Sequence, residues 1–216
     1  MNLYRKKEQS RLQKWTVIGL ETLILFLAAW LLFFVDEQLS LRNFLLFGLF
    51  LIVYGRMYVT IFYLLKRKMP WQEAMTIPVA FSLYYIGFSI FTLITDKPVD
   101  LLDIGSILLF LIGSFINTYS EIQRDRWKRE PAHKGGLYTE GLFTYAMHIN
   151  YFGDLVWVTA LALFTRSTGA LIIPIILFCF LAWYNIPILD TYLADKYGEQ
   201  FKRYKQSTNK LIPFLY

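Results

Sequence analysis

Three polar side chains interrupt an apolar segment in the second half of the chain. His148, Asn150 and Asp154 lie within Leu142–Phe164, a stretch long enough to enter a bilayer. Asn150 and Asp154 are four residues apart, so they share one helix face, and Gly153 removes a side chain beside them. Polar groups at membrane depth are costly and usually mark functional sites. This face would suit a bound polar ligand, unless its groups only pair with those of neighbouring helices.

Further polar residues within apolar segments could belong to the same chemistry. Asn117 and Glu121 are again four residues apart and share a face. Glu121 could equally pair with Arg124, three residues on. In the first half, Glu21 and Arg56 lie within apolar segments, and each could serve only as the ion-pair partner of the other.

Several classes of site are not predicted. The only cysteine, Cys179, and the two histidines provide neither a disulfide framework nor the ligands of a metal site. No glycine-rich dinucleotide fingerprint and no phosphate loop is present. The formal charge of +6 comes from clusters between hydrophobic segments, so it does not indicate a nucleic-acid partner. Met1–Lys14 is basic but lacks a cleavage signature, so we expect no cleaved signal peptide.

The elements that carry these residues are predicted from hydropathy. The 216 residues are 56% hydrophobic, and apolar runs of about 20 residues recur, which indicates an all-α, polytopic transmembrane helical bundle. We expect about six spans, near Thr16–Val35, Leu45–Leu65, Ala74–Ile94, Leu101–Ser120, Leu142–Phe164 and Thr168–Leu189. Asp190–Tyr204 should then form an amphipathic helix on the cytoplasmic side, which Gly198 could interrupt.

Basic residues alternate between the loops. They cluster before the first span and after the second, fourth and sixth: Arg5, Lys6, Lys7, Arg11 and Lys14; Lys66, Arg67 and Lys68; Arg124, Arg126, Lys128, Arg129 and Lys134; Lys196, Lys202, Arg203, Lys205 and Lys210. The other side carries only Arg42, Lys97 and Arg166. The positive-inside rule therefore places the N- and C-termini in the cytoplasm.

The motifs of the second half resemble a known superfamily. Gly141–Tyr145 followed by Asn150–Asp154 is similar to the corresponding run of the steroid 5α-reductases, and more similar still to that of bacterial membrane proteins with a steroid-reductase-like C-terminal domain. The isoprenylcysteine carboxyl methyltransferases share this superfamily. The resemblance extends to Asn117, Ser120–Arg124, Asp190, Tyr197-Gly198, Tyr204 and Leu211–Phe214.

No linker is long enough to separate domains, so we expect a single integral membrane domain over residues 1–216. The resemblance implies that residues 117–216 form its cofactor-binding half. It implies NADPH as the cofactor, reached from the cytoplasmic side. The residues that match the family's motifs, and that we assign to cofactor binding, are Asn117, Glu121, Arg124, His148, Asn150, Tyr151, Asp154, Asp190 and Tyr197.

The sequence also departs from the family. Ile149 replaces the usual proline before Asn150. Leu189 and Leu193 stand near the positions where the eukaryotic reductases carry an arginine and a histidine that help bind the cofactor. The positive charge that binds the cofactor's phosphates would then come from Arg124, Arg126 and Lys128 instead.

The first half resembles the reductases more faintly. Tyr54-Gly55-Arg56 and Leu64–Trp71 are similar to two of their runs, with one residue missing from the first. The resemblance implies Tyr54 as the catalytic tyrosine and Glu21 as its carboxyl partner. Reduction of an activated C=C bond needs hydride delivery to one carbon and an acid near the enolate oxygen, which such a pair could provide.

Three functions follow from these observations. The leading one is NADPH-dependent reduction of an activated C=C bond in a steroid-, prenyl- or fatty-like substrate, by an integral protein of a bacterial cell membrane. The alternative is an S-adenosylmethionine-dependent membrane methyltransferase; of that family's Arg-His-Pro-x-Tyr motif, His148 and Tyr151 are present. The third is a non-enzymatic lipid-binding membrane protein, in which the polar groups are structural.

Overall fold

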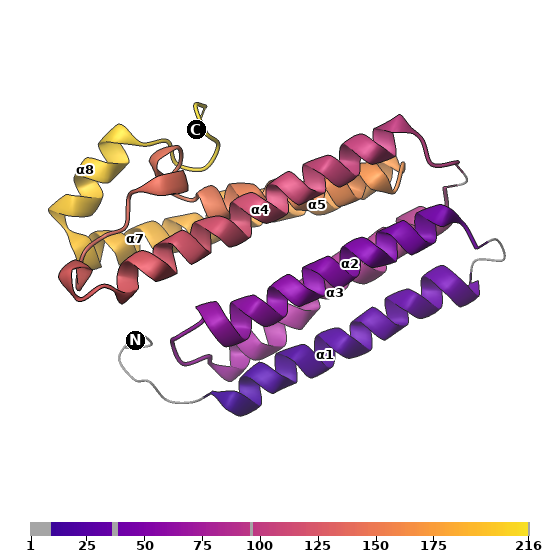
Figure 1. Cartoon of the computed structure of the whole chain (residues 1–216), viewed down its shortest axis with the longest axis horizontal. Coiled ribbons are helices and arrows are strands. Elements are labelled where there is room, and N and C mark those ends of the chain that lie inside the picture. The colour runs from indigo at the N-terminus through magenta and orange to yellow at the C-terminus, as the bar shows by residue number, and fades with distance from the viewer. Residues whose placement is uncertain (1–9, 36–38, 96, 216) are drawn as a thin grey trace. The chain divides into compact units, whose positions relative to one another are not determined.

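The computed structural model describes residues 10–35, 39–95 and 97–215, and every regular element within them is helical (Figure 1). The prediction of an all-α protein is confirmed. The α-helices are α1 (Arg11–Trp30), α2 (Leu41–Val59), α3 (Trp71–Leu93), α4 (Leu101–Arg129), α5 (Ile149–Phe164), α6 (Ile172–Phe180), α7 (Ile186–Tyr197) and α8 (Glu199–Ser207). Short 3₁₀ or π turns are η1 (Leu31–Val35), η2 (Thr60–Leu64), η3 (Pro131–His133), η4 (Gly141–Thr144), η5 (Thr168–Leu171) and η6 (Leu181–Asn185).

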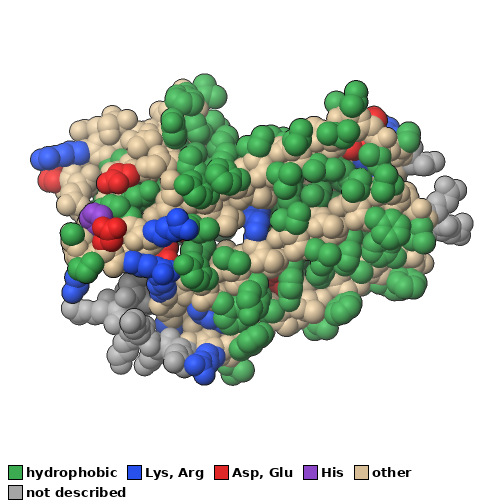
Figure 2. Space-filling model, in the orientation of Figure 1, with side chains coloured by type: hydrophobic (Ala, Val, Ile, Leu, Met, Phe, Trp, Pro, Cys, Tyr) green, Lys and Arg blue, Asp and Glu red, His purple; other side chains and the backbone are tan. Residues whose placement is uncertain are grey.

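Five helical segments are long and apolar enough to cross a membrane. They are Arg11–Val35, Leu41–Leu64, Trp71–Leu93, Leu101–Arg129 and Thr168–Tyr197, and Ile149–Phe164 is a shorter apolar helix. On the face drawn in Figure 2, hydrophobic side chains cover most of the helices, and charged side chains gather mainly toward helix ends. The chain is therefore an integral membrane protein. The predicted basic residues Arg5, Lys6 and Lys7 lie outside the described residues.

The fifth predicted span is shorter than expected. It was expected from Leu142, but α5 begins at Ile149 and has 16 residues, about 24 Å. The backbone explains the difference. The N–H groups of Met147 and His148 donate to the carbonyl oxygens of Asn209 and Lys210, at 2.8 and 3.0 Å. A pairing between segments so distant in sequence cannot be read from hydropathy.

The expected amphipathic helix is not a separate element. Its first half is α7, which continues from α6 through the π turn η6, and Pro187 near the start of α7 lacks the N–H that a regular turn would use. Gly198, with φ of 51°, ends α7, and α8 follows. The predicted interruption at Gly198 is therefore present.

The chain packs as two compact units, and each is described by itself. Unit 1 comprises Met1–Ile104 and Leu161–Ile173; unit 2 comprises Gly105–Ala160 and Pro174–Tyr216. In unit 1, α1, α2 and α3 lie side by side (Figure 1). In unit 2, α4 and α5 lie side by side, and α7, α8 and the C-terminal segment pack against the start of α5.

Candidate active site

Two glycines bring α4 and α5 into backbone contact within unit 2. A Cβ atom added to Gly153 would lie 2.5 Å from the backbone nitrogen of Asn117. One added to Gly113 would lie 2.5 Å from the backbone nitrogen of Trp157. Only glycine fits at these crossings, as in other close membrane-helix pairs. This contact fixes the register between the polar side chains of the two helices.

At this crossing the predicted polar residues form one hydrogen-bonded chain. The Asn117 carboxamide donates to the Asn150 carbonyl oxygen (3.1 Å), and the Asn150 Nδ2 donates to Glu121 Oε1 (2.9 Å). Arg124 forms an ion pair with the other oxygen of Glu121. The local Glu121–Arg124 pair considered from the sequence is thus present. The structure brings together Asn117, Glu121, Arg124 and Asn150, as the motifs indicated.

Tyr151 and Asp154 lie beside this chain of hydrogen bonds. The Tyr151 hydroxyl faces the Asn185 side chain, and the charges of Arg124, Glu121 and Asp154 act on it. Asp154 accepts a hydrogen bond from the indole N–H of Trp157, at 2.8 Å. Asn185, the last residue of η6, was not predicted; the available signal was a carboxamide within an otherwise apolar span.

The charged end of α4 carries Arg124 and Lys128, and the charge of Lys196 on α7 acts there too. The positive charges of Arg124 and of Lys196 on α7 act on the Lys128 ammonium group, and so do the carboxylates of Glu121 and Asp125. The Lys196 ammonium also lies over the rings of Tyr192 and Tyr197, 5.5 and 5.1 Å from their centroids. Arg124 and Lys128 were predicted to supply phosphate charge, whereas Lys196 was missed because α7 must fold beside α4 to bring it there. Glu121 and Asp125 offset part of this positive charge.

His148 and Asp190, both predicted to bind the cofactor, pair with each other. His148 Nε2 lies 2.8 Å from Asp190 Oδ1, and both side chains are buried. Lys210 lies 3.9 Å from the other oxygen of Asp190. Because Lys210 also accepts the His148 backbone N–H, this group joins α5, α7 and the C-terminal segment. Its geometry suits a support for the site more than a direct ligand contact.

Aromatic residues near the end of the chain pack around Met147, next to this His148–Asp190 group. Tyr197 packs with Leu193, Phe201 and Tyr204 around Met147. The Tyr204 hydroxyl donates to the Phe143 carbonyl oxygen at 2.5 Å. Burial raises the pKa of Tyr204, so this hydroxyl remains a neutral donor at physiological pH.

The predicted catalytic pair, Glu21 and Tyr54, belongs to unit 1. Glu21 is fully buried on α1, and neither of its carboxyl oxygens has a hydrogen-bond partner among the described residues. The Glu21–Arg56 ion pair considered from the sequence is therefore not formed. Tyr54, on α2, lies 2.7 Å from the Thr22 hydroxyl instead of bonding to Glu21. The predicted direct link between tyrosine and carboxyl is absent in the described chain.

Tyr85, on α3, completes this part of unit 1. Its side chain is fully buried, its ring packs edge-on against Phe50 of α2 at 5.2 Å, and its hydroxyl has no hydrogen-bond partner in the described chain. Glu21, Tyr54 and Arg56 are all near enough to act electrostatically on that hydroxyl. That its hydroxyl would be buried without a hydrogen-bond partner in the described chain cannot be read from the sequence.

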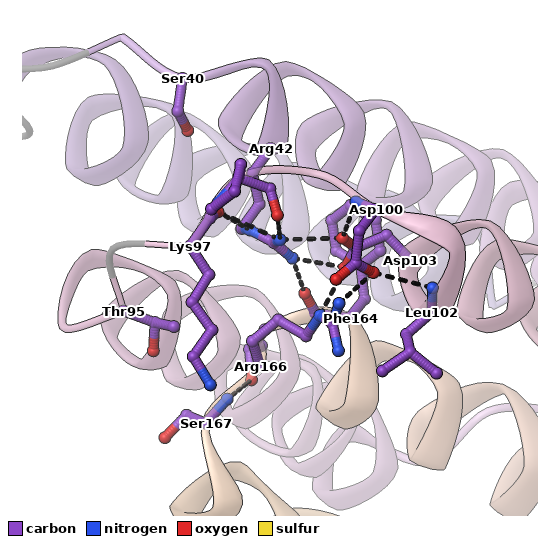
Figure 3. Close-up of polar contacts among 12 residues, drawn as sticks. Ser40, Arg42, Thr95, Lys97, Asp100, Leu102, Asp103, Phe164, Arg166 and Ser167 are labelled. Atoms are coloured by element: carbon purple, nitrogen blue, oxygen red, sulfur yellow. Dashed lines mark hydrogen bonds and ion pairs between the residues drawn. The ribbon is translucent and has the colours of Figure 1, made fainter.

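A second polar cluster of unit 1 surrounds Arg42 (Figure 3). Arg42 is 2% exposed and forms two bonds to the fully buried Asp103, at 2.6 and 2.9 Å. Its guanidinium also donates to the carbonyl oxygens of Lys97, Pro98 and Phe164. Arg166 pairs with Asp100 and Asp103. Arg42 was expected in a loop, but the first turn of α2 carries it into the protein.

The sequence is similar to one protein family and to two known proteins over part of its length. The profile of the family described as "Protein of unknown function (DUF1295)" matches residues 69–208. Over 93 residues the chain is 32% identical to the "Probable O-methyltransferase ustE" of Ustilaginoidea virens. This match covers 41% of this chain and 32% of that protein. Over 110 residues the chain is 28% identical to the "3-oxo-5-alpha-steroid 4-dehydrogenase 2" of Rattus norvegicus. This match covers 51% of this chain and 41% of that protein.

Proposed function

The chain belongs to the DUF1295 family, and we propose that it is a membrane-embedded, NADPH-dependent reductase of an activated C=C bond in a lipid-soluble substrate. The observation that carries this proposal is that the charges of Arg124 and Lys196 both act on Lys128, at the end of α4 that carries the Glu121–Asn150 pair. NADPH bears phosphate groups, whereas S-adenosylmethionine has none. A cluster of cations next to a carboxamide and a carboxylate therefore favours the phosphorylated cofactor.

The residues of unit 2 divide the binding between charge and hydrogen bonds. The charge of Arg124 is balanced by Glu121, so Lys128 and Lys196 are the cations best suited to phosphate oxygens. Asn150 is held by its bond to Glu121, which fixes its carboxamide for contact with an amide or a ribose hydroxyl. The donor set thus fits NADPH, with its phosphates toward the lysines.

Bound NADPH would supply a hydride, and the net reaction would be enone, NADPH and a proton giving the saturated ketone and NADP⁺. The protein's own part is to hold the substrate's carbonyl oxygen by hydrogen bonds as negative charge develops there. In low dielectric, a hydrogen-bond donor to such a developing oxyanion gains strength.

Cofactor titration tests the proposal. NADPH fluorescence should report saturable binding to the purified protein, and Lys196→Gln should weaken that binding about tenfold or more, the range for a hydrogen bond to a charged group. Lys202→Gln is the matched control, since Lys202 is an exposed lysine on α8 beside Glu199. Equal weakening by both substitutions, or none by either, would remove the lysines from the site.

Asp154 offers a second comparison in the same titration. Asp154→Asn removes the charge beside Tyr151, and we expect weaker NADPH binding by about 1.5–3 kcal/mol. Asp154→Glu should be tolerated, because the resembling family carries glutamate there. Unchanged affinity in Asp154→Asn would take this carboxylate out of the cofactor site.

The methyltransferase alternative has one observation of its own, the 32% identity to a protein named as a probable O-methyltransferase. Under that alternative the same titration would show tight S-adenosylmethionine binding. The lysine substitutions would leave that binding unchanged, because the ligand carries no phosphate.

The orientation that brings a cytoplasmic cofactor to unit 2 follows from the basic loops. We propose that both termini are cytoplasmic and that Ser167 lies on the opposite side. Reporter fusions at Ser167 and after Tyr216 should report opposite faces, the second of them inner. The reverse pattern would contradict a cytoplasmic cofactor entrance.

A further inference from the structure

We propose that Phe143 and Tyr204 are positioning residues of the cofactor site, which act on the bound cofactor through Arg124. The Tyr204 hydroxyl of α8 fixes Phe143 in η4, and the Phe143 ring holds the Arg124 guanidinium in its ion pair with Glu121. This inference rests on the proposed reductase function and deepens it. It names two residues, outside the set predicted to bind the cofactor, that fix the geometry of that set.

Phe143 presents the face of its ring to a cation. The guanidinium carbon of Arg124 lies over this ring, 5.5 Å from its centroid. Phe143 is 3% exposed, whereas the Arg124 side chain is 34% exposed. The negative face of an aromatic ring attracts a guanidinium group, so a buried ring beside a partly exposed arginine restrains the cation. The contact therefore limits where Arg124 can place its charge.

Contacts from three directions hold Phe143 itself. The Tyr204 hydroxyl, which is buried, donates to the Phe143 carbonyl oxygen at 2.5 Å. On the side of α4, Gln123 Oε1 accepts the backbone N–H of the adjacent Leu142 at 3.1 Å. The Tyr138 ring packs edge-on against the Phe143 ring, with 5.5 Å between centroids. Both the backbone and the ring of Phe143 are thus fixed.

The first residue of η4 allows no other path for this turn. Gly141 has φ of 60°, a conformation that residues with a side chain rarely adopt. A Cβ atom added there would lie 2.7 Å from Gln123 Oε1 and 2.8 Å from the Tyr138 hydroxyl oxygen. The turn therefore packs closely on α4, and this close packing sets the distance between Phe143 and Arg124.

Arg124 passes this constraint on to the carboxamide of Asn150. One oxygen of Glu121 pairs with Arg124, and the other accepts from Asn150 Nδ2 at 2.9 Å. A partly exposed ion pair between residues three apart is weak by itself, because both long side chains keep many rotamers. The Phe143 ring reduces the rotamers open to Arg124, so Glu121 keeps its second oxygen toward Asn150. One path of contacts thus runs from Tyr204 on α8 to Asn150 on α5.

Fluorination of the Phe143 ring tests this path with little change in packing. Phenylalanines with one, two or three ring fluorines are incorporated at position 143 of the full-length protein, and each fluorine weakens the attraction of the ring for a cation. We expect the Kd of NADPH, measured by fluorescence titration, to rise stepwise by about three- to tenfold in all, the range for loss of a cation–π contact. No trend at Phe143 would overturn the inference.

The same series at Phe110 is the matched control. Phe110 is a fully buried ring on α4 that packs edge-on against Trp157, and no cation lies over it in the part of the chain that the structure describes. Its fluorination should leave the Kd of NADPH unchanged. An equal trend at Phe110 and Phe143 would show a general effect of fluorine and overturn the inference.

The Arg124 side chain gives a second readout in the ligand-free protein. A proton above the face of an aromatic ring resonates upfield in NMR spectra, and the Arg124 Nε–H signal is identified by its loss in Arg124→Lys. We expect an upfield signal in wild type that loses its shift in Phe143→Leu and part of it in Tyr204→Phe. An unchanged signal in Tyr204→Phe, or failure of that variant to fold, would assign Tyr204 to structure alone and overturn its part. The fluorine series then decides the part of Phe143.

These outcomes are separable from those of the cofactor proposal. If NADPH binds to wild type with an affinity that the fluorines at Phe143 do not change, the reductase proposal stands and the positioning inference is overturned. If wild type binds no NADPH, the reductase proposal fails, and the fluorine series is titrated with S-adenosylmethionine instead. A stepwise loss of that affinity would support the positioning role, and a constant affinity would overturn it.

Discussion

The two buried polar clusters of unit 1 differ in how completely their atoms are hydrogen-bonded. Around Arg42, the guanidinium and the Asp103 carboxylate bond to each other and to neighbouring backbone groups. Around Glu21 and Tyr85, equally buried oxygens have no partner in the described chain. A saturated cluster stabilises the fold, whereas an unsaturated one leaves bonding capacity for a ligand. The comparison separates a cluster whose polar atoms are hydrogen-bonded from one whose polar atoms are not.

The largest expected effect comes from breaking the saturated cluster. Asp103→Ala leaves the Arg42 charge buried without its carboxylate, and we expect a loss of about 3–5 kcal/mol in the free energy of unfolding. Denaturation of the purified protein in detergent measures it. Asp125→Ala is the control, because it removes a surface pair with Arg129 and should cost less than about 1 kcal/mol. Similar losses in the two variants would contradict a structural role specific to the Arg42 cluster.

Removing a polar group from the cluster around Glu21 and Tyr85 should instead raise the stability of the protein. Glu21→Met conserves the approximate volume and removes a carboxyl that has no partner, so the ligand-free protein should gain about 1–3 kcal/mol in stability. Enone reduction should fall by about 10²-fold or more in the same variant, as for loss of a catalytic acid. A destabilised Glu21→Met protein would place Glu21 with the structural residues.

Unit 2 extends the comparison, because close backbone contact holds its polar residues in place. Gly153→Ala inserts a methyl group against the Asn117 backbone, and we expect a loss of about 1–3 kcal/mol from overpacking. Gly105→Ala on α4 is the matched control, since nothing lies within 4 Å of its Cβ position. That variant should be neutral or slightly stabilised, because alanine favours a helix over glycine. The free energy of unfolding of the two variants, measured in parallel in detergent, tests this. Equal stabilities would show that the α4–α5 contact does not stabilise the protein.

The smallest effect concerns the hydroxyl of Tyr54. Tyr54→Phe removes one hydrogen bond to Thr22, so stability should fall by only about 0.5–1.5 kcal/mol. Denaturation in detergent measures it, and a loss of stability well above that range would contradict a single hydrogen bond to Thr22.

Much of the fold could be predicted from the sequence, because hydropathy depends on local composition. The long apolar helices and the interruption at Gly198 follow from residue type alone. The start of α5 does not, since it depends on backbone bonds from Met147 and His148 to the C-terminal segment. Features set by partners distant in sequence escape hydropathy.

Only part of the candidate site could be predicted from the sequence, for the same reason. Asn117, Glu121 and Asn150 share helix faces that spacing reveals, and the structure joins them. Lys196 and Asn185 reach the site only through the packing of later helices. The burial of Arg42 and the missing partners of Tyr85 are properties of the folded chain. The sequence does not show whether the polar atoms of a charged or hydroxyl side chain will find hydrogen-bond partners in the folded protein.

Mass spectrometry of small molecules that co-purify with the full-length protein tests the central claim most directly. The protein is isolated in mild detergent, in parallel with Lys196→Gln, and bound nucleotides are released by denaturation. We predict NADP(H) at an appreciable fraction of the protein concentration in wild type, and much less in the variant. S-adenosylmethionine or its demethylated product in place of NADP(H), retained equally by both proteins, would contradict the reductase account and establish the methyltransferase alternative.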